Sequence, residues 1–459
     1  MKKINTSPIS GMLELLPPDQ AIFNQIKSKI AEAYRLHGFQ NIETPSIDRN
    51  EILFAKAGGD TEKQIYRVIK TTESAEDSTE SLKYDHTVTL ARFVAEHESD
   101  LNFPFKVMQI GKNFRGERPQ KGRYREFYQC DIDIIGRNNL SIHYDAEIIN
   151  ALSDALTSFI SVPLHVRISN RKILSGLISL LDLEKSSAEI YSLIDHSEKV
   201  PAEKTKTGFK EVLKDEKLAN IFLKFIDCLD SADEDAIITA LEKILKMAEE
   251  YLSSSSKKSS ASKEATELYR TGISELVTVC NLLNHFNIGR NVYVTADMRI
   301  VRGLDYYTGT VFETVIDGYE GIGSVCSGGR YENLTSYYSD QKFPGVGGSI
   351  GLTRMFATLK ENGLIKEKSP LVDYAIVPFF TSEHQEELRF FAEEVAATLR
   401  KDGKSVDVIL AEKKLRDQLS YASKIAKNVI VIGENELESR KVKAKDFATG
   451  KESELNLDF

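Results

Sequence analysis

The segment from Phe114 to Asp133, FRGERPQKGRYREFYQCDID, combines cations, aromatic rings and carboxylates within one short stretch. It contains four arginines and one lysine, although the whole chain has a net charge of −9. Alternate residues of a β-strand share a face, so Arg123, Phe127 and Gln129 would lie together with Asp133. Such a face could bind a ligand with an anionic part, a planar ring and a cationic part, because arginine forks fit phosphate oxygens. A solvated, salt-bridged hairpin face would carry the same pattern.

Three later segments contain further residues that could contact a ligand. They are VRGLDYYTGTVFE at 301–313, CSGGRYENL at 326–334 and GVGGSIGLTRMF at 345–356. Each also has a purely structural interpretation. The tyrosine pair could pack in the core, the two glycines before Arg330 could form a plain turn, and the last glycine run could allow close helix–strand packing. The last segment lacks the Gly-Lys-Ser/Thr step of a phosphate-binding P-loop.

Several other chemistries find no support in the sequence. It contains neither a GxSxG nor an HExxH motif, and its histidines lie in separate segments. Cysteines 130, 228, 280 and 326 are scattered without a CxxC pair, which argues against a zinc site and favours a reducing cytoplasm. We expect no membrane span, because no apolar run approaches the roughly 20 residues that one needs. The motifs therefore indicate binding and electrostatic catalysis, with no metal site built by the chain.

The elements that must position these residues can be predicted from periodicity. The runs FKVMQIGKNF and GRYREFYQCDIDIIG, joined by a loop rich in Pro, Gly and Lys, predict a long antiparallel hairpin. A helix with Asp19 as its N-cap is predicted from Asp19 to His37. The polar, helix-rich residues from Lys172 onward indicate an insertion into a larger domain. Strand–helix alternation after Pro370 predicts a small α/β unit with a mostly parallel sheet.

Taken together and in this order, the quoted segments resemble those of the histidyl-tRNA synthetases, a class II aminoacyl-tRNA synthetase family. FRGERPQKGRYREF resembles class motif 2, and GVGGSIGLTRMF resembles motif 3. VRGLDYYTGTVFE and GGRYENL resemble the two histidine signatures peculiar to this family, and KYDHT resembles its amino-acid-binding turn. The predicted helix at 19–37 and the strand after it resemble motif 1, which forms the dimer interface in the family. The similarity extends over nearly the whole chain.

The resemblance implies an α+β catalytic domain of the class II synthetase type, in which helices flank an antiparallel sheet. It also implies a helical insertion and a C-terminal anticodon-binding α/β domain. The expected boundaries are 1–171 and 271–365 for the two parts of the catalytic core, 172–270 for the insertion and 370–459 for the last domain.

Roles for individual residues follow from the same resemblance. The catalytic cations beside the α-phosphate would be Arg115 and Arg302. ATP would be bound by Arg115, Glu117, Arg123, Phe127 and Arg354. The α-amino group of histidine would be held by Asp85, Thr87 and Gln129, and its carboxylate by Arg115. The imidazole would be contacted by Asp133 and Tyr307, with the pocket shaped by Tyr306 and Tyr331.

The implied activity is that of a histidine–tRNA ligase, which activates L-histidine with ATP and transfers it to histidine tRNA. Mg²⁺ would accompany the β- and γ-phosphates, and the enzyme would be a cytoplasmic homodimer. The turn residue His86, the Glu332 of GGRYENL and the SGMLELLP start depart from the family pattern. The alternatives are the synthetase-like regulatory subunit of ATP phosphoribosyltransferase, another class II synthetase and a non-catalytic RNA-binding module. The intact segment VRGLDYY favours the histidine enzyme.

Overall fold

The structure, a computed structural model, describes most of the 459-residue chain. The described residues are 4–55, 62–72, 74, 77–118, 122–254, 262–286, 290–301, 307–333, 335–365, 370–379, 384–411 and 413–457. The chain divides into two compact units, one of Met1–Leu13 with Ile26–Ile365 and one of Glu14–Gln25 with Lys366–Phe459. Within the described parts of the chain, none of the helices combines the length and apolar character that crossing a bilayer requires.

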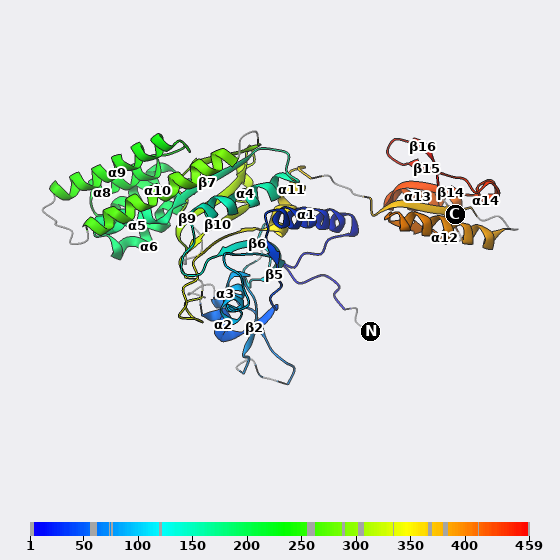
Figure 1. The fold of residues 1–459 in the computed structure, drawn as a ribbon, viewed down its shortest axis with the longest axis horizontal. Coiled ribbons are helices and arrows are strands. Elements are labelled where there is room, and N and C mark those ends of the chain that lie inside the picture. The colour runs from blue at the N-terminus through cyan, green and yellow to red at the C-terminus, as the bar shows by residue number, and fades with distance from the viewer. Residues whose placement is uncertain are drawn as a thin grey trace. The chain divides into compact units, whose positions relative to one another are not determined.

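An eight-stranded mixed sheet forms the centre of the first unit (Figure 1). Its strands run in the order β1-β5-β6-β11-β10-β9-β7-β8. Their bounds are β1 Gln40–Asn41, β5 Phe105–Phe114, β6 Glu126–Ile135, β7 Leu164–Asn170, β8 Val292–Ala296, β9 Tyr307–Ile316, β10 Cys326–Tyr331 and β11 Gly345–Ile350. The six strands from β5 to β7 are joined by antiparallel pairing, and only the two edge strands β1 and β8 pair in parallel.

The hairpin β5–β6 fixes the register of the residues singled out above. Gly111 pairs with Gln129 and Asn113 with Phe127, and on the other side of β6 Asp131 pairs with Ser349 and Asp133 with Gly347. Because directly paired residues point to the same side, all of these side chains share one face of the sheet. The strand begins at Glu126, so Arg123 lies in the connection before it.

Helices pack against this sheet, as the helical spacing of apolar residues in their sequences predicts. They are α1 Pro17–Leu36, α4 His143–Thr157 and α11 Leu352–Glu361. In α1, Ile26, Ile30 and Tyr34 recur at helical spacing and are buried, and the Tyr34 hydroxyl donates a hydrogen bond of 3.0 Å to the backbone oxygen of Cys130 on β6. Helix α4 packs against β6, β10 and β11, and α11 packs against β6.

A small three-stranded sheet leads into the predicted amino-acid-binding turn. It contains β2 Ile47–Arg49, β3 Arg67–Val68 and β4 Glu80–Leu82, in the order β2-β4-β3. Helix α2 Asn50–Phe54 follows β2, and α3 Thr87–Glu96 follows the turn after β4. This arrangement holds Asp85 between a strand and the start of a helix.

Between β7 and β8 the described chain is helical, apart from short connections. The helices are α5 Arg171–Leu180, α6 Ser187–His196, α7 Ala202–Leu213, α8 Glu216–Ile226, α9 Glu234–Ser254 and α10 Ser262–Phe286 (Figure 1). Side chains cap α5, α8 and α9: Asn170 Oδ1 accepts from Lys172 N, Asp215 Oδ1 accepts from the amides of Lys217 and Leu218, and Asp233 Oδ1 accepts from the amide of Ala236.

The second unit contains a five-stranded sheet of order β13-β12-β14-β15-β16. Its elements are β12 Val372–Pro378, α12 Gln385–Lys401, β13 Val406–Val408, α13 Leu415–Ile425, β14 Ala426–Ile432, α14 Glu434–Ser439, β15 Val442–Asp446 and β16 Glu452–Leu455. Ile376 packs with α12, whereas its neighbours Ala375 and Val377 pack with the α13 side. Because alternate residues point to opposite faces, the two helices cover opposite sides of this sheet.

The predicted fold class is confirmed: a large, mainly antiparallel sheet flanked by helices is followed by an α/β unit. Two details differ from the prediction. Helix α1 begins at Pro17, so Asp19 lies in its first turn and is not the N-cap, because proline fits the first helical positions. The last sheet is more mixed than predicted, since β14, β15 and β16 pair antiparallel.

Candidate active site

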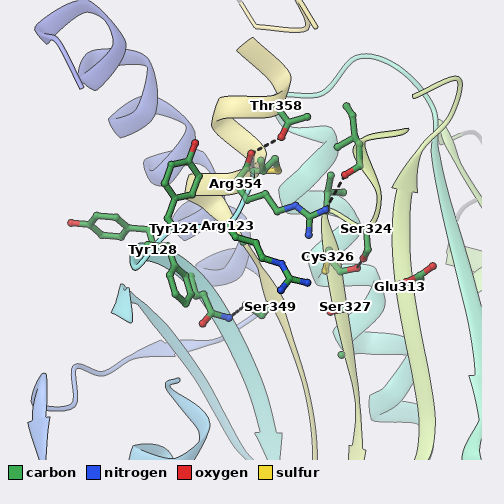
Figure 2. Close-up of a pocket in the computed structure, with 18 of the residues that line it drawn as sticks. Arg123, Tyr124, Tyr128, Glu313, Ser324, Cys326, Ser327, Ser349, Arg354 and Thr358 are labelled. Atoms are coloured by element: carbon green, nitrogen blue, oxygen red, sulfur yellow. Dashed lines mark hydrogen bonds between the residues drawn. The ribbon is translucent and has the colours of Figure 1, made fainter. Parts of the chain in front are cut away.

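A cavity of about 450 Å³ lies against the sheet of the first unit. Its walls come from the β5–β6 connection, from β6, β9, β10 and β11, and from α11. In Figure 2 Arg123 and Arg354 enter this space from separate segments, while Ser349 and Glu313 line it from two strands. Segments far apart in the sequence therefore supply the wall of one cavity.

The cationic wall is built around the connection between β5 and β6. Arg115 Nε donates to the backbone oxygen of Tyr84 at 3.1 Å, and the guanidinium lies 5.1 Å from the centre of the Phe127 ring. Arg123 Nη1 lies 3.2 Å from Glu117 Oε2, and Arg123 is the more exposed partner of that pair. The wall thus places two cations and an aromatic face side by side, which suits phosphate oxygens and a planar base.

Arg354 approaches the cavity from the first turn of α11. Its Nη2 donates a hydrogen bond of 3.1 Å to the backbone oxygen of Ile322, and its side chain passes beside Gly122. Gly122 has a φ of +75°, a backbone conformation that glycine adopts without strain. Arg115, Glu117, Arg123, Phe127 and Arg354, the five residues predicted to bind ATP, all line this one cavity.

Beyond Gln129, which lines the cavity, the same face of β6 carries a buried carboxylate–tyrosine pair. The Tyr331 hydroxyl donates a hydrogen bond of 2.9 Å to Asp133 Oδ1. Two glycines of β11 make room for this pair, since a Cβ on Gly347 would lie 2.0 Å from Asp133 Oδ1 and one on Gly345 would lie 2.4 Å from the Tyr331 ring. Gly345 and Gly347 therefore accommodate side chains of their own sheet, whereas Gly348 allows the close packing of a helix that the sequence suggested, since a Cβ there would lie 2.6 Å from Leu152 of α4.

Burial perturbs two carboxyl groups on this face of β6. It raises the pKa of Asp131 to about 8, against a hydrogen bond from Ser349 that lowers it. Burial likewise raises the pKa of Asp133 to about 7, against the hydrogen bond from Tyr331. The Asp85 carboxylate adds to both shifts, so it lies within electrostatic reach of the other two. Such a cluster favours a cationic ligand, whose charge would replace the protons.

The predicted amino-acid-binding turn lies next to this cluster. Asp85 is buried and accepts a hydrogen bond of 3.0 Å from the amide of Val88 in the first turn of α3. Thr87 begins that helix and is half-buried. His86 is buried on the same side of the sheet, where its Cε1 lies 3.2 Å from the position of a Cβ on Gly111, the strand partner of Gln129. Burial lowers the pKa of His86 to about 3, so this histidine is neutral and fills the space that Gly111 leaves.

The structure also shows participants that sequence reasoning missed. Glu313 lines the cavity and pairs at 3.0 Å with Arg167, whose guanidinium also binds Asp297 at 2.6 Å. Burial would raise the pKa of Asp297, but hydrogen bonds and charges from Arg299 and Arg167 lower it. Each strand carries one such charge in the sequence, Arg167 in β7 and Glu313 in β9, but their pairing depends on a register that only the fold provides.

The predicted site residues are distributed as follows. Gln129 and Tyr307 line the cavity together with the five residues predicted to bind ATP. Asp133 and Tyr331 extend the same face inward, and Tyr331 pairs with Tyr307 across β10 and β9. Asp85 lies within electrostatic reach of Asp133, and Thr87 follows in the same turn. The two remaining predicted residues, Arg302 and Tyr306, lie outside the described residues.

Comparison with known proteins supports the same family that the motifs suggested. A family model described as Histidyl-tRNA synthetase matches residues 11–355, and one described as Anticodon binding domain matches residues 373–459. The chain is 40% identical over 459 residues to the histidine–tRNA ligase of Clostridium acetobutylicum, with 99% of each chain covered.

Solved structures agree with this result. The crystal structure of histidyl-tRNA synthetase from a Nostoc species superposes with a TM-score of 0.84 at 31% identity, covering 99% of this chain and 97% of that one. A Bacillus halodurans structure titled as an ATP phosphoribosyltransferase regulatory subunit/histidyl-tRNA synthetase has a TM-score of 0.71 at 20% identity, covering 94% of this chain and 100% of that one; it shows a shared fold alone. The full-length match and the two family models lead to one conclusion: the chain belongs to the histidyl-tRNA synthetase family.

Proposed function

We propose that this chain is a histidine–tRNA ligase whose cavity binds ATP and L-histidine next to each other along β6. The observation that carries the proposal is one continuous sheet face. Arg115 and Phe127 lie at its cavity end, Gln129 lies in the middle, and the pair Asp133–Tyr331 lies further along. The two substrates carry matching groups in the same order: the triphosphate and purine of ATP, then the ammonium group and imidazole of histidine.

In the first step, a carboxylate oxygen of histidine forms a bond to the α-phosphorus, and the bond from that phosphorus to the bridging oxygen breaks. Pyrophosphate leaves with the electron pair of that bond. Negative charge accumulates on the phosphate oxygens, so Arg115 and Arg302 lower the barrier by electrostatics and positioning. In the second step, the terminal ribose hydroxyl of the tRNA attacks the adenylate carbonyl and AMP leaves. No protein nucleophile takes part.

Selection of histidine rests on Asp133, with Tyr331 orienting that carboxyl group. An imidazole N–H donates to the carboxylate, and an amino acid without such a donor leaves a buried acceptor unpaired. Asp85, Thr87 and Gln129 hold the α-amino group. Tyr307 contacts the imidazole together with Asp133, while Tyr306 and Tyr331 shape the pocket. Glu117 and Phe127 bind adenine, and Arg123 and Arg354 hold the outer phosphates.

Mg²⁺ would supply counter-charge to the β- and γ-phosphates. Within the described residues, no group of three acidic, histidine or cysteine side chains could cage a metal ion. The two carboxylates of the cavity wall, Glu117 and Glu313, are each paired with an arginine. These residues do not fit a metal site built by the protein, so Mg²⁺ would enter as part of the nucleotide and no step is assigned to it.

The proposal extends to the organisation of the whole enzyme. Residues 1–171 and 271–365 form the catalytic core, residues 172–270 are an insertion, and residues 370–459 bind the anticodon region of histidine tRNA. The enzyme acts as a cytoplasmic homodimer with motif 1 at its interface. All four cysteines are free, which is consistent with a reducing compartment.

The experiment that tests the proposal is aminoacylation of histidine tRNA with labelled histidine and ATP. We expect label in the tRNA fraction that depends on ATP and on the chain. Arg302→Ala should slow adenylate formation severely while the protein stays folded. A folded wild-type chain that leaves the tRNA unlabelled would overturn the proposed function.

A further inference from the structure

A chain of four hydrogen-bonded side chains crosses the floor of the cavity. Asn113 Nδ2 donates to Gln129 Oε1 at 2.8 Å, and Gln129 Nε2 donates to Ser349 Oγ at 2.8 Å. Ser349 Oγ then donates to Asp131 Oδ1. The four residues come from β5, β6 and β11, and they lie on the one face that the strand registers define.

The two ends of this row of hydrogen-bonded side chains are buried, and only its middle lines the cavity. Asn113 is fully buried and Asp131 nearly so, whereas Gln129 and Ser349 form part of the wall. Asn113 therefore cannot reach a ligand in the cavity. Any influence it has on a ligand must pass through Gln129.

The hydrogen bonds run in one direction, from donor to acceptor, and this direction fixes which way the Gln129 amide faces. When Asp131 is ionised, as a bound cationic ligand favours, it accepts the single hydroxyl hydrogen of Ser349, so the Ser349 oxygen accepts from Gln129. Rotating the amide by half a turn would place Gln129 Nε2 against the donor of Asn113 and Oε1 against the oxygen of Ser349. The contact with the Ser349 oxygen would be repulsive, so Oε1 stays on the Asn113 side, where it accepts from Asn113 Nδ2 and keeps one lone pair available.

Stability alone would favour an apolar side chain at position 113. The Asn113 Oδ1 atom is buried without a hydrogen-bond partner among the described residues, and such an orphan acceptor is costly. A leucine of similar size would have no such atom. What the Asn113 side chain provides in return for this unfavourable buried acceptor is a hydrogen-bond donor to Gln129.

We propose that Asn113 is a positioning residue for histidine binding: it holds the Gln129 amide with its oxygen available to the α-ammonium group of the substrate. This inference rests on the proposed function, in which Gln129 contacts that group. Asn113 then contributes to selection of an α-amino acid without touching it. Asp131 and Ser349 set the same orientation from the opposite end.

The test compares the affinities of two ligands measured by titration calorimetry, L-histidine and 3-(imidazol-4-yl)propanoate, which lacks only the α-amino group. In Asn113→Leu we expect histidine affinity to fall by at least about tenfold, while affinity for the des-amino ligand stays within about twofold. The KM for histidine in pyrophosphate exchange should rise by the same factor, with the KM for ATP unchanged. The melting temperature should be equal or higher.

A matched control is Thr205→Val, which also replaces a buried side chain whose oxygen has no partner among the described residues, but in α7. It should leave both affinities unchanged. If both ligands lose affinity equally in Asn113→Leu, or neither does, the inference is wrong. If Asn113→Leu does not fold, Ser349→Ala breaks the row of hydrogen bonds from its other side. It must lower the affinity for histidine more than the affinity for the des-amino ligand.

A fourth variant, Gln129→Leu, separates this inference from the role proposed for Gln129. If Gln129→Leu abolishes the preference for histidine over the des-amino ligand but Asn113→Leu does not, only the positioning role fails. If Gln129→Leu leaves the preference unchanged, the proposed contact between Gln129 and the ammonium group fails, and with it the inference.

Discussion

The hydroxyl of Tyr331 and the carboxyl group of Asp133 meet across β11, where Gly347 leaves the space that the carboxyl group occupies. The hydroxyl donates at 2.9 Å to Oδ1 and thereby fixes the orientation of Asp133. Tyr331 holds one oxygen, and in the proposed function the other accepts the imidazole N–H of histidine. The proposed specificity for histidine depends on this hydrogen bond. Three predictions test it, through the carboxyl group itself, the space at Gly347 and the pH dependence of stability.

The first prediction concerns the carboxyl group itself. Asp133→Asn keeps the size of the side chain but replaces a charged acceptor, so histidine affinity should fall by roughly 1.5–3 kcal/mol, the range for hydrogen bonds to charged groups. Calorimetric titration with histidine and, separately, with ATP measures the effect. ATP affinity should be preserved, and a variant with unchanged histidine affinity would remove Asp133 from the imidazole site.

The second prediction concerns the space beneath that carboxyl group. A Cβ in Gly347→Ala would lie 2.0 Å from Asp133 Oδ1, so the carboxyl group must move. Overpacking of this kind costs about 1–3 kcal/mol, and the KM for histidine should rise with it. The control is Gly321→Ala, where no atom lies within 4 Å of the added Cβ. Equal kinetics for the two variants would contradict this account of the glycine run.

The third prediction concerns pH. The pKa values of Asp131 and Asp133 are raised to about 8 and about 7, whereas an unfolded aspartate titrates near about 3.9. Between these values the folded protein binds more protons than the unfolded chain, so the free energy of unfolding falls as pH rises through about 4 to 8. Each group contributes at most about 1.4 kcal/mol per pH unit.

Urea denaturation of the ligand-free protein at several pH values measures this slope. The double variant Asp131→Asn, Asp133→Asn should show a shallower decline between pH 6 and pH 8 than the wild type. Identical slopes for the two proteins would show that these carboxyl groups are not protonated in the fold. Histidine binding should release protons near pH 7, because a cationic ligand favours the ionised carboxylates.

The fourth prediction concerns the buried ion pairs behind the cavity. Arg167→Met leaves Glu313 and Asp297 without their shared cation, and breaking a buried pair typically costs about 3–5 kcal/mol. Arg270→Met is the control, because the pair Arg270–Glu242 is exposed and such pairs contribute only about 0–1 kcal/mol. Urea midpoints for both variants test the difference. Equal midpoints would mean that the Arg167 cluster does not stabilise the sheet.

Strand alternation was enough to predict which side of β6 holds Phe127, Gln129 and Asp133, because the period of two follows from backbone geometry alone. It could not predict the link from Gln129 to Ser349, residues 220 positions apart, or the one from Arg167 to Glu313. Those contacts depend on the order of strands in the sheet. The need for glycine at position 347 could not be predicted for the same reason, since the side chain it accommodates comes from a neighbouring strand.

The measurement that tests the central claim most directly is amino-acid-dependent exchange of labelled pyrophosphate into ATP by the full chain. The claim predicts exchange with L-histidine and none with glycine or threonine, because only histidine offers an imidazole N–H to the Asp133 carboxylate. Absence of exchange with every amino acid would indicate a non-catalytic chain. Exchange with glycine or threonine would contradict the proposed specificity.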